Sequence, residues 1–252
     1  SIKAMKHLLI LLSFMFLYNC NSDNIFDCIQ GEGNRIRQEI EIESFDQILV
    51  NRDIELILKQ EQFHNVIVET GQNLLSGIKV EVIENQLQLT DDNTCNFVRD
   101  YGLTKIFVSA PNINQIIQSS QYDVSSDGIL NFPDLKIISE DFSLTNNFTV
   151  GDYRLELSCN NLEIISNNIS SFFISGSTTN LTIGFFSGSG RFEADGLIAQ
   201  NISLFHRGSN DMIINPQLSL RGELRGTGDV ISKNEPAIVE VEQFYTGTLL
   251  FQ

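Results

Sequence analysis

Apolar and polar residues alternate along most of the chain, which is the pattern of β-strands with one buried face. Between Ile36 and Val108 the alternation comes in short runs, such as Ile54-x-Leu56-x-Leu58 and Ile78-x-Val80-x-Val82, separated by turn-forming residues. No segment after residue 19 has the spacing of an amphipathic helix, and residues 73–78 could form a single helical turn. The pattern therefore predicts an all-β protein.

From residue 113 the apolar pairs recur with a repeat. Its clearest turns begin at nearly constant intervals, at Ser187, Arg207, Arg225 and Tyr245. A repeat of about 18–20 residues suits one coil of a β-solenoid. Asparagine segments such as 160–161 and 178–180 stand where later repeats have glycine turns. We expect them to form equivalent turns, because Asn tolerates left-handed backbone. We expect a β module at 31–111 that continues into β-solenoid repeats at 112–252.

The N-terminus has the pattern of an export signal. Lys3 and Lys6 precede an apolar run, 8–17, that is too short to span a bilayer. Residues 1–19 are therefore predicted to be a signal peptide, followed by Cys20 as a lipid acceptor and a tether at 20–30. Asn19 is not the small residue usual before such a cysteine, so a plain secretory signal is the alternative. We expect a lipid-anchored protein of the outer membrane or cell surface, with a periplasm-facing position also open.

Charge and cysteines restrict the partners further. The chain has a net charge of −16, and removal of the signal leaves 14 basic and 32 acidic residues, which disfavours nucleic acid. In an oxidising compartment Cys28 and Cys95 are the preferred disulfide pair, with Cys159 as a buried free thiol. The histidines His64 and His206 have no nearby metal-ligating residues in sequence, so neither a metal site nor a cofactor is predicted.

Some charged residues could carry chemistry, because β-helices also host polysaccharide lyases and hydrolases. Such an enzyme needs clustered carboxylates and a base. The candidate residues near the repeat turns are Asp195, Asp211 and Asp229 with Arg191, Arg207 and Arg225. A solvated rim is the favoured interpretation. Calcium ligation at 91–93 and 140–141 is likewise disfavoured, and no role is assigned to the Asn-x-Ser/Thr triplets at Asn147, Asn168, Asn180 and Asn201.

The aromatic residues of the repeats fit an interior stack better than a sugar-stacking platform. The residues expected inside are Phe142, Phe173, Phe185, Phe192, Phe205 and Phe244. The adjacent pairs 172–173 and 185–186 must each point one ring outward if their strands are regular. Phe172 or Phe186 is therefore the expected exposed aromatic.

Several motifs together resemble a known family. They are Gly31-x-Gly33-Asn34, Phe45-Asp46-x-Ile48-x-Val50, Ile54-x-Leu56-x-Leu58-x-Gln60, Val66-x-Val68-Glu69, Val108-x-x-Pro111 and the later Ser-Gly-Ser-Gly turn. In this order they are similar to the head GIN domain family of putative auto-transporter adhesins, found among exported lipoproteins of Bacteroidetes. The resemblance implies a solenoid-like all-β fold at the cell envelope and brings no catalytic residues.

We therefore expect a non-enzymatic envelope lipoprotein that acts as an adhesin or binding module for a glycan or protein. The alternatives are a polysaccharide-acting β-helix enzyme and a purely structural envelope protein. The apolar end of the sequence, 249–251, also predicts self-association through a C-terminal strand.

Overall fold

The computed structural model describes residues 31–93, 100, 102, 104–140 and 148–252. These residues form 19 strands, and their one helical segment is a 3-10 turn, Leu75–Gly77. The predicted all-β class and the single turn within 73–78 are confirmed. The part of the chain described has no helix with the length and hydropathy needed to cross a membrane. Several predictions concern residues outside the described ranges, namely the signal peptide, the tether, Cys20, Cys28, Cys95, Asp141, Phe142 and Asn147.

All 19 strands belong to one hydrogen-bonded sheet. They are β1 (Arg35–Ile40), β2 (Gln47–Val50), β3 (Ile54–Gln60), β4 (Asn65–Gly71), β5 (Ile78–Ile83), β6 (Gln86–Asp91), β7 (Thr104–Ala110), β8 (Gln115–Gln118), β9 (Val124–Leu130), β10 (Asp134–Ser139), β11 (Tyr153–Ser166), β12 (Phe172–Phe185), β13 (Phe192–Glu193), β14 (Leu197–His206), β15 (Met212–Ile214), β16 (Pro216–Leu224), β17 (Val230–Ser232), β18 (Ile238–Gln243) and β19 (Leu249–Phe251).

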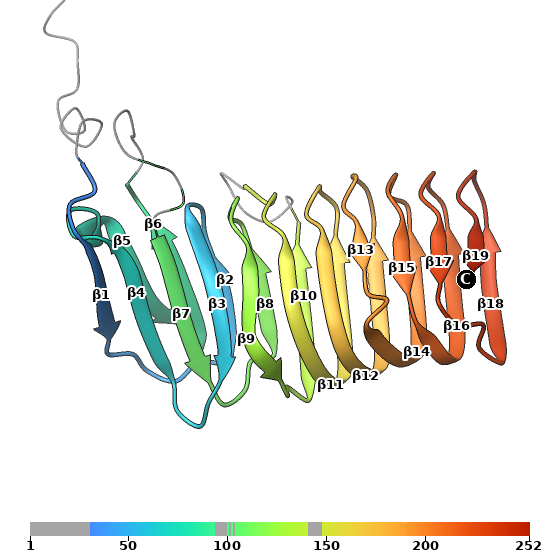
Figure 1. Cartoon of the computed structure of the whole chain (residues 1–252), viewed down its shortest axis with the longest axis horizontal. Helices are drawn as coiled ribbons and strands as arrows, with labels where there is room; N and C mark the ends of the chain where they lie inside the picture. Colours follow the sequence, from blue (N-terminus) through green and yellow to red (C-terminus); the bar gives the residue numbers. More distant parts are fainter. Residues whose placement is uncertain (1–30, 94–99, 101, 103, 141–147) are drawn as a thin grey trace, which may run out of the picture.

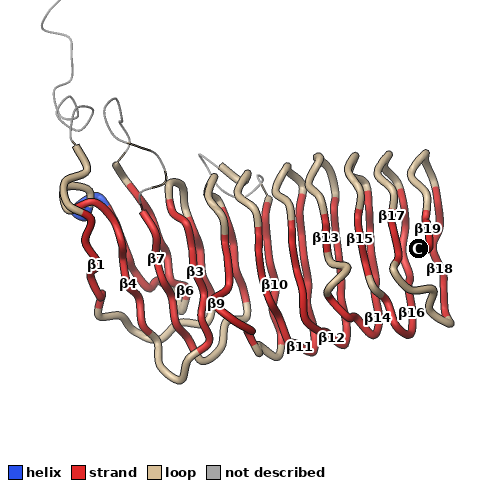
Figure 2. Tube along the Cα trace, viewed as in Figure 1, coloured by secondary structure: helices blue, strands red, loops and turns tan. Residues whose placement is uncertain are grey.

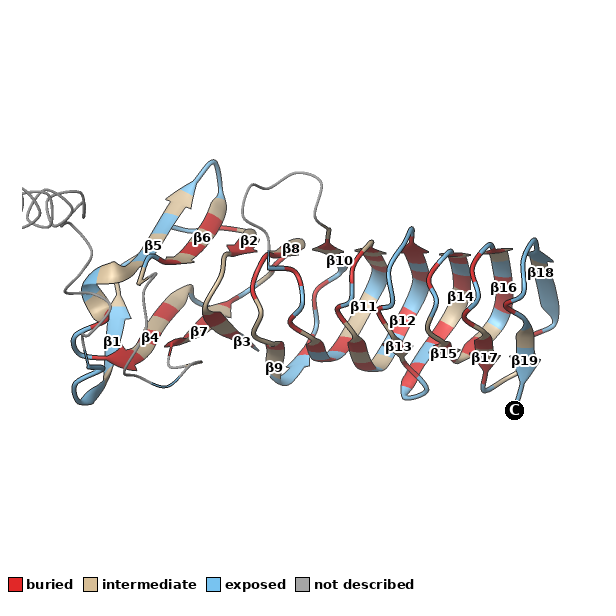
Figure 3. Cartoon of the chain, turned by 90° about the horizontal axis from the view of Figure 1, so that it is seen from above, coloured by how far each residue is buried: buried red, intermediate tan, exposed pale blue. Residues whose placement is uncertain are grey.

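The strands form an elongated stack with two faces (Figures 1 and 3). Face A consists of β5, β6, β2, β8, β10, the second halves of β11 and β12, β14, β16 and β18 in pairing order. Face B consists of β1, β4, β7, β3, β9, the first halves of β11 and β12, β13, β15, β17 and β19. Figure 2 shows loops joining the strands at both edges of the stack.

Strands after residue 112 pair in parallel, and from β11 onward the offset is nearly constant. Tyr153 pairs with Phe172, and Met212 pairs with Val230, so each residue meets its counterpart in the next repeat. A constant offset places equivalent residues of successive repeats above one another in columns. Longer offsets join Val124 to Tyr153 and Asp134 to Asn161, and in both cases the intervening chain includes a segment outside the description. The repeat seen in the sequence is therefore a repeat of strand pairing.

The N-terminal module differs because β1, β4 and β5 run antiparallel to their neighbours. The β5–β6 hairpin has a two-residue loop, Glu84 and Asn85, with φ of 49° and 67°. Positive φ at both central residues is characteristic of a type I′ turn, whose twist matches that of paired strands. This module is joined to the repeats by the parallel pairing of β2 with β8 and of β3 with β9.

Apolar side chains from both faces fill the interior of the stack. Tyr153 and Phe172 stack with ring centroids 4.7 Å apart and planes 5° apart, and Phe192 follows Phe172 in the same column. Of the two alternatives for an exposed aromatic, Phe172 is fully buried, because it falls in an inward column between two other rings. The prediction for Phe186 is confirmed, since 45% of it is exposed.

The remaining aromatic residues are buried or accessible according to whether their side chains point into or out of the stack. Phe185 and Phe192 are buried as expected. Phe173 and Phe205 are half-buried and point outward, and Phe244 is exposed under the guanidinium of Arg225, 3.9 Å from its ring centroid. The interior assignment of these three rings was therefore wrong, because register places them on outward columns.

Two of the asparagine segments expected to form turns, 160–161 and 178–180, lie in strands instead, whereas 167–168 lies in the connection between β11 and β12. Asn161 and Asn180 lie within the continuous strands β11 and β12, and the described non-glycine residues with positive φ are Asp53, Glu84 and Asn85. The amides instead bond along the stack, with Asn180 Nδ2 donating to Asn161 Oδ1 at 2.8 Å and Asn201 Nδ2 to Asn180 Oδ1 at 3.2 Å. This ladder satisfies the side chains without left-handed backbone.

Candidate functional site

Of the three aspartates of the enzyme alternative, two accept hydrogen bonds from the next repeat and the third lies in a separate loop. Asp211 Oδ1 accepts the backbone N–H of Asp229 at 3.0 Å. Asp229 Oδ1 accepts the N–H and hydroxyl of Thr248 at 2.8 and 3.0 Å. Asp211 and Asp229 thus tie one repeat to the next, whereas Asp195 is exposed in another loop.

Two of the three candidate arginines form local ion pairs. Arg191 and Arg225 form ion pairs with Glu193 and Glu223, each two residues away, and Arg207 is exposed. The structure therefore aligns Asp211 with Asp229 but pairs these arginines with glutamates. Among the described residues no group of three or more His, Cys, Asp or Glu side chains could hold a metal ion.

Asp91, from the proposed calcium segment, is a buried structural residue. Its carboxylate accepts hydrogen bonds from Asn93 N and Nδ2, both at 2.8 Å, and from the Thr104 hydroxyl at 2.9 Å. Burial raises the pKa of Asp91 against the opposing effect of these bonds. The segment 91–93 thus uses its oxygens internally.

Cys159 is free, as expected, but half-buried rather than buried. Desolvation raises the pKa of its thiol, so the side chain is held in the protonated form. A protonated thiol is a poor nucleophile, so the structure gives no support for a nucleophilic role of Cys159.

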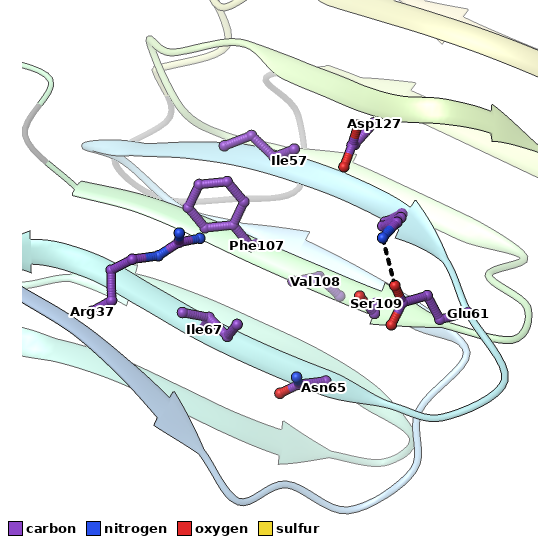
Figure 4. A pocket seen from close by; sticks show the side chains of 10 residues that line it. Arg37, Ile57, Glu61, Asn65, Ile67, Phe107, Val108, Ser109 and Asp127 are labelled. Carbon is purple, nitrogen blue, oxygen red and sulfur yellow. Dashed lines mark ion pairs between the residues drawn. The ribbon is translucent and has the colours of Figure 1, made fainter.

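A groove on the outside of face B is a candidate binding site (Figure 4). Its apolar floor crosses three adjacent strands, because Ile67 of β4 is in register with Phe107 of β7, which is in register with Ile57 of β3. The hollow has a volume of about 300 Å³ and is lined besides by Arg37, Asn65, Ser109, Asp127, Lys59 and Glu61. An aromatic floor with a polar rim is the usual composition of a binding site for a partly apolar ligand.

Charged side chains on the rim of this groove are held in pairs. The Arg37 guanidinium lies 4.6 Å from the Phe107 ring centroid and 3.4 Å from the Glu69 carboxylate. Lys59 and Glu61 form an ion pair at 2.7 Å, which raises the pKa of Lys59 and lowers the pKa of Glu61. The rim therefore offers both charges and several amide and hydroxyl groups at neutral pH.

Sequence reasoning missed Phe107 and Arg37. Phe107 stands between Ile106 and Val108, so the alternation that marks these as inward also places the ring outward. Its neighbours Ile57 and Ile67 occupy outward positions of other alternating runs. The groove depends on the registers of β3, β4 and β7, which local patterning does not specify.

Residues 44–236 match the family described as "Putative auto-transporter adhesin, head GIN domain". The chain belongs to this family. The resemblance noted from the sequence motifs is thereby confirmed. A comparison with curated proteins finds no match.

Solved structures of similar fold come from Bacteroides and Parabacteroides. A putative adhesin from Bacteroides fragilis is 21% identical with a TM-score of 0.79, covering 88% of this chain and 100% of that one. A putative lipid binding protein from Parabacteroides distasonis is 15% identical, with a TM-score of 0.59 and coverage of 87% and 97%. A putative adhesin from Parabacteroides merdae is 16% identical, with a TM-score of 0.57 and coverage of 88% and 98%. At these identities the likeness shows the fold alone.

Proposed function

We propose that the protein is a non-enzymatic adhesin or binding module of the cell envelope, exported and anchored by lipid at Cys20. We further propose that its repeats form a β-solenoid that extends from the anchored N-terminal module. The adhesin family and the parallel, in-register pairing of the repeats support these proposals. The observation that carries the binding role is the Phe107 groove, a half-buried apolar floor with a charged rim.

The enzyme alternative has less support. A hydrolase or lyase needs an acid and a base that reach one substrate bond. Asp211 and Asp229 instead accept backbone hydrogen bonds, and Arg191 and Arg225 are paired with glutamates. A binding role uses the groove without requiring such a pair.

The groove is tested by substituting Phe107→Ala in the mature chain and measuring retention on arrays of glycans and of matrix proteins. We expect ligands retained by the wild type to be lost or weakened about tenfold, since removal of an aromatic anchor costs on the order of 1–3 kcal/mol. Phe173→Ala is the matched control, because Phe173 is also outward on face B with an arginine, Arg154, 4.3 Å from its ring.

Two outcomes of this experiment would contradict the proposal. Equal loss in Phe107→Ala and Phe173→Ala would show that the groove is not the site. Release of products from a polysaccharide by the wild type, abolished in Asp211→Ala, would show an enzyme.

The lipid anchor is tested separately in cells. Cys20→Ser is expected to move the protein from the membrane to the aqueous fraction and to abolish incorporation of labelled fatty acid. Fractionation with the membrane in the variant would contradict the anchor without affecting the groove.

We also propose that the C-terminal end of the stack pairs with a second copy. Among the described residues the registers pair β18 with β16 and β19 with β17, and side chains there are exposed, including 39% of Val239 and 65% of Tyr245. An open strand edge with apolar side chains favours pairing. Size-exclusion chromatography with and without residues 245–252 tests this, and a monomer in both cases would contradict it.

A further inference from the structure

A row of apolar side chains crosses the outer surface of face A, on the opposite side from the Phe107 groove. Ile117 of β8 is in register with Ile138 of β10, which is in register with Ile165 of β11. The next positions in this row are Gly184 of β12 and Phe205 of β14. The three isoleucines and Phe205 are half-buried and point outward. We call this row the apolar stripe.

Gly184 leaves room in the stripe for a ring from outside the strand. A Cβ at this position would lie 2.7 Å from Cε2 and Cζ of Phe186, so the Phe186 ring occupies the space that a side chain would fill. The Phe186 and Phe205 rings are 5.3 Å apart between centroids, with planes inclined by 32°. These two half-exposed rings form an aromatic pair at the end of the stripe beside a hollow of about 180 Å³.

A row of hydrogen-bonding side chains runs alongside the stripe, two residues earlier on each strand. It consists of Gln115, Lys136, Glu163, Thr182 and Ser203. Its two charges cancel, because Lys136 Nζ pairs with Glu163 at 3.2 Å. Thr182, Ser203 and Glu163 also line the hollow beside the aromatic pair. Face A thus presents an apolar row and a nearly neutral polar row in parallel.

We propose that these two rows form a binding track for an extended, uncharged glycan chain, with Phe186 and Phe205 as its anchor. A sugar ring has an apolar C–H face that stacks on aromatic rings and an edge of hydroxyls that bond to polar side chains. Successive repeats are about 4.8 Å apart, close to the length that one sugar unit adds to an extended chain. The inference rests on the proposed binding function and names its ligand class, but at a surface separate from the groove.

The chemistry of the track disfavours other ligands. An acidic polysaccharide would meet a chain of net charge −16, with Glu223 next to Phe205 in the same row. An acyl chain would cover the stripe but leave the polar row without partners. A protein partner would require about 800 Å² of surface per side, whereas the concave part of the track is a single small hollow.

The test measures binding of neutral gluco- and manno-oligosaccharides of increasing length to the mature chain by calorimetry. We expect affinity to rise with oligosaccharide length until the stripe is covered. Phe186→Ala is expected to weaken binding about tenfold, the order of a lost aromatic contact. Gly184→Ala keeps both aromatic residues but displaces the Phe186 ring, and should weaken binding similarly.

Matched controls separate the track from general effects. Phe63→Ala removes a more exposed ring, 77% exposed, that lies outside the track, and should leave affinity unchanged. Thermal unfolding of each variant establishes that it is folded, and Gly184→Ala supplies the test if Phe186→Ala is destabilised. Oligogalacturonate, an acidic probe, should bind at least about tenfold more weakly than a neutral chain.

The outcomes distinguish the track from the groove. Loss in Phe186→Ala and Gly184→Ala with binding kept in Phe107→Ala supports the track. Neutral oligosaccharide binding that depends on Phe107 alone, or no binding of any neutral oligosaccharide, overturns the track and leaves the groove to its own test. Displacement of a bound oligosaccharide by a fatty acid, with loss in Phe186→Ala, would identify an acyl site and also overturn it.

Discussion

The N-terminal module and the repeats after residue 112 solve the same packing problem differently. In the repeats every described pairing is parallel, and the nearly constant offset from β11 onward places asparagines, aspartates and phenylalanines in columns. In the module, β1, β4 and β5 are antiparallel to their neighbours. The groove lies where β4, β7 and β3 are adjacent. The regular stacking of the repeats produces extended rows of similar side chains, whereas the mixed pairing of the N-terminal module produces a local hollow.

The edge strands of the two regions also differ. β1 is mostly exposed and has Arg35, Arg37 and Glu39 along an edge strand. Charged edge strands disfavour further pairing. The edge formed by β18 and β19 carries exposed apolar residues instead. The two edges therefore differ in chemistry, with charged side chains along β1 and exposed apolar side chains around β18 and β19.

The largest effect is expected where close stacking leaves no space for a side chain. Gly222 of β16 has φ of +145°, and a Cβ there would overlap the carbonyl oxygen of Leu204 in the preceding repeat. We expect Gly222→Ala to lower the free energy of unfolding by about 2–4 kcal/mol. Gly31→Ala in the module is the control, since nothing lies within 4 Å of its Cβ position. Urea unfolding of both variants measures the difference, and similar values would contradict the steric role assigned to Gly222.

The buried amide of Asn168 should matter more than the exposed ladder. Asn168 bonds to the Ser139 carbonyl and hydroxyl, both at 2.9 Å, and accepts the Ser170 N–H at 2.9 Å. Asn168→Ala leaves buried groups without partners and should cost about 2–3 kcal/mol of unfolding free energy. Asn180→Ala removes exposed amide bonds and should cost less than about 1 kcal/mol. Chemical denaturation of the two variants checks the ranking, which equal costs would refute.

His206 should make the repeats sensitive to mild acid. Its ring is fully buried, and among the described residues neither ring nitrogen makes a hydrogen bond of regular geometry. Burial lowers the pKa of His206, although Asn210, Asp211 and Asp229 act in the opposite direction. Because the unfolded chain then binds the proton more tightly, stability is lost as pH falls below about 6.5, by at most about 1.4 kcal/mol per pH unit.

His206→Leu is therefore expected to flatten the stability profile between pH 7 and about pH 5. Its neighbour in the same column, Leu224, is a buried apolar residue, so a leucine at position 206 matches its surroundings. Thermal unfolding over this pH range tests the expectation. An unchanged slope in the variant would assign the acid sensitivity elsewhere.

The smallest effect concerns Asp91 in the module and has the opposite sign. Because burial raises its pKa, the folded state holds this proton more tightly, and ionisation subtracts stability as pH rises above about 4. Asp91→Asn should thus gain stability relative to the wild type on going from pH 4 to pH 7, by roughly 1 kcal/mol or less. Unfolding measured at both pH values tests this, and a relative loss would contradict it.

The sequence by itself determined the all-β class, the repeat and the family. Alternation of apolar residues is a local property of each strand, and the regular spacing of the turns follows from a nearly constant length of chain per repeat. These features need no knowledge of which strands pair. The sequence also predicted an exposed ring in the pair 185–186, because two adjacent phenylalanines cannot both face inward on a regular strand.

Only the tertiary structure decided which side chains meet. Phe172 is buried because it falls between Tyr153 and Phe192, and Phe107 forms a groove because β4 and β3 flank β7. The apolar stripe likewise depends on the registers that align Ile138, Ile165 and Gly184. Register between strands is set by the summed packing of distant residues, and a shift of one residue would reverse every side chain. For this reason local pattern could predict the strands but not the surfaces they build.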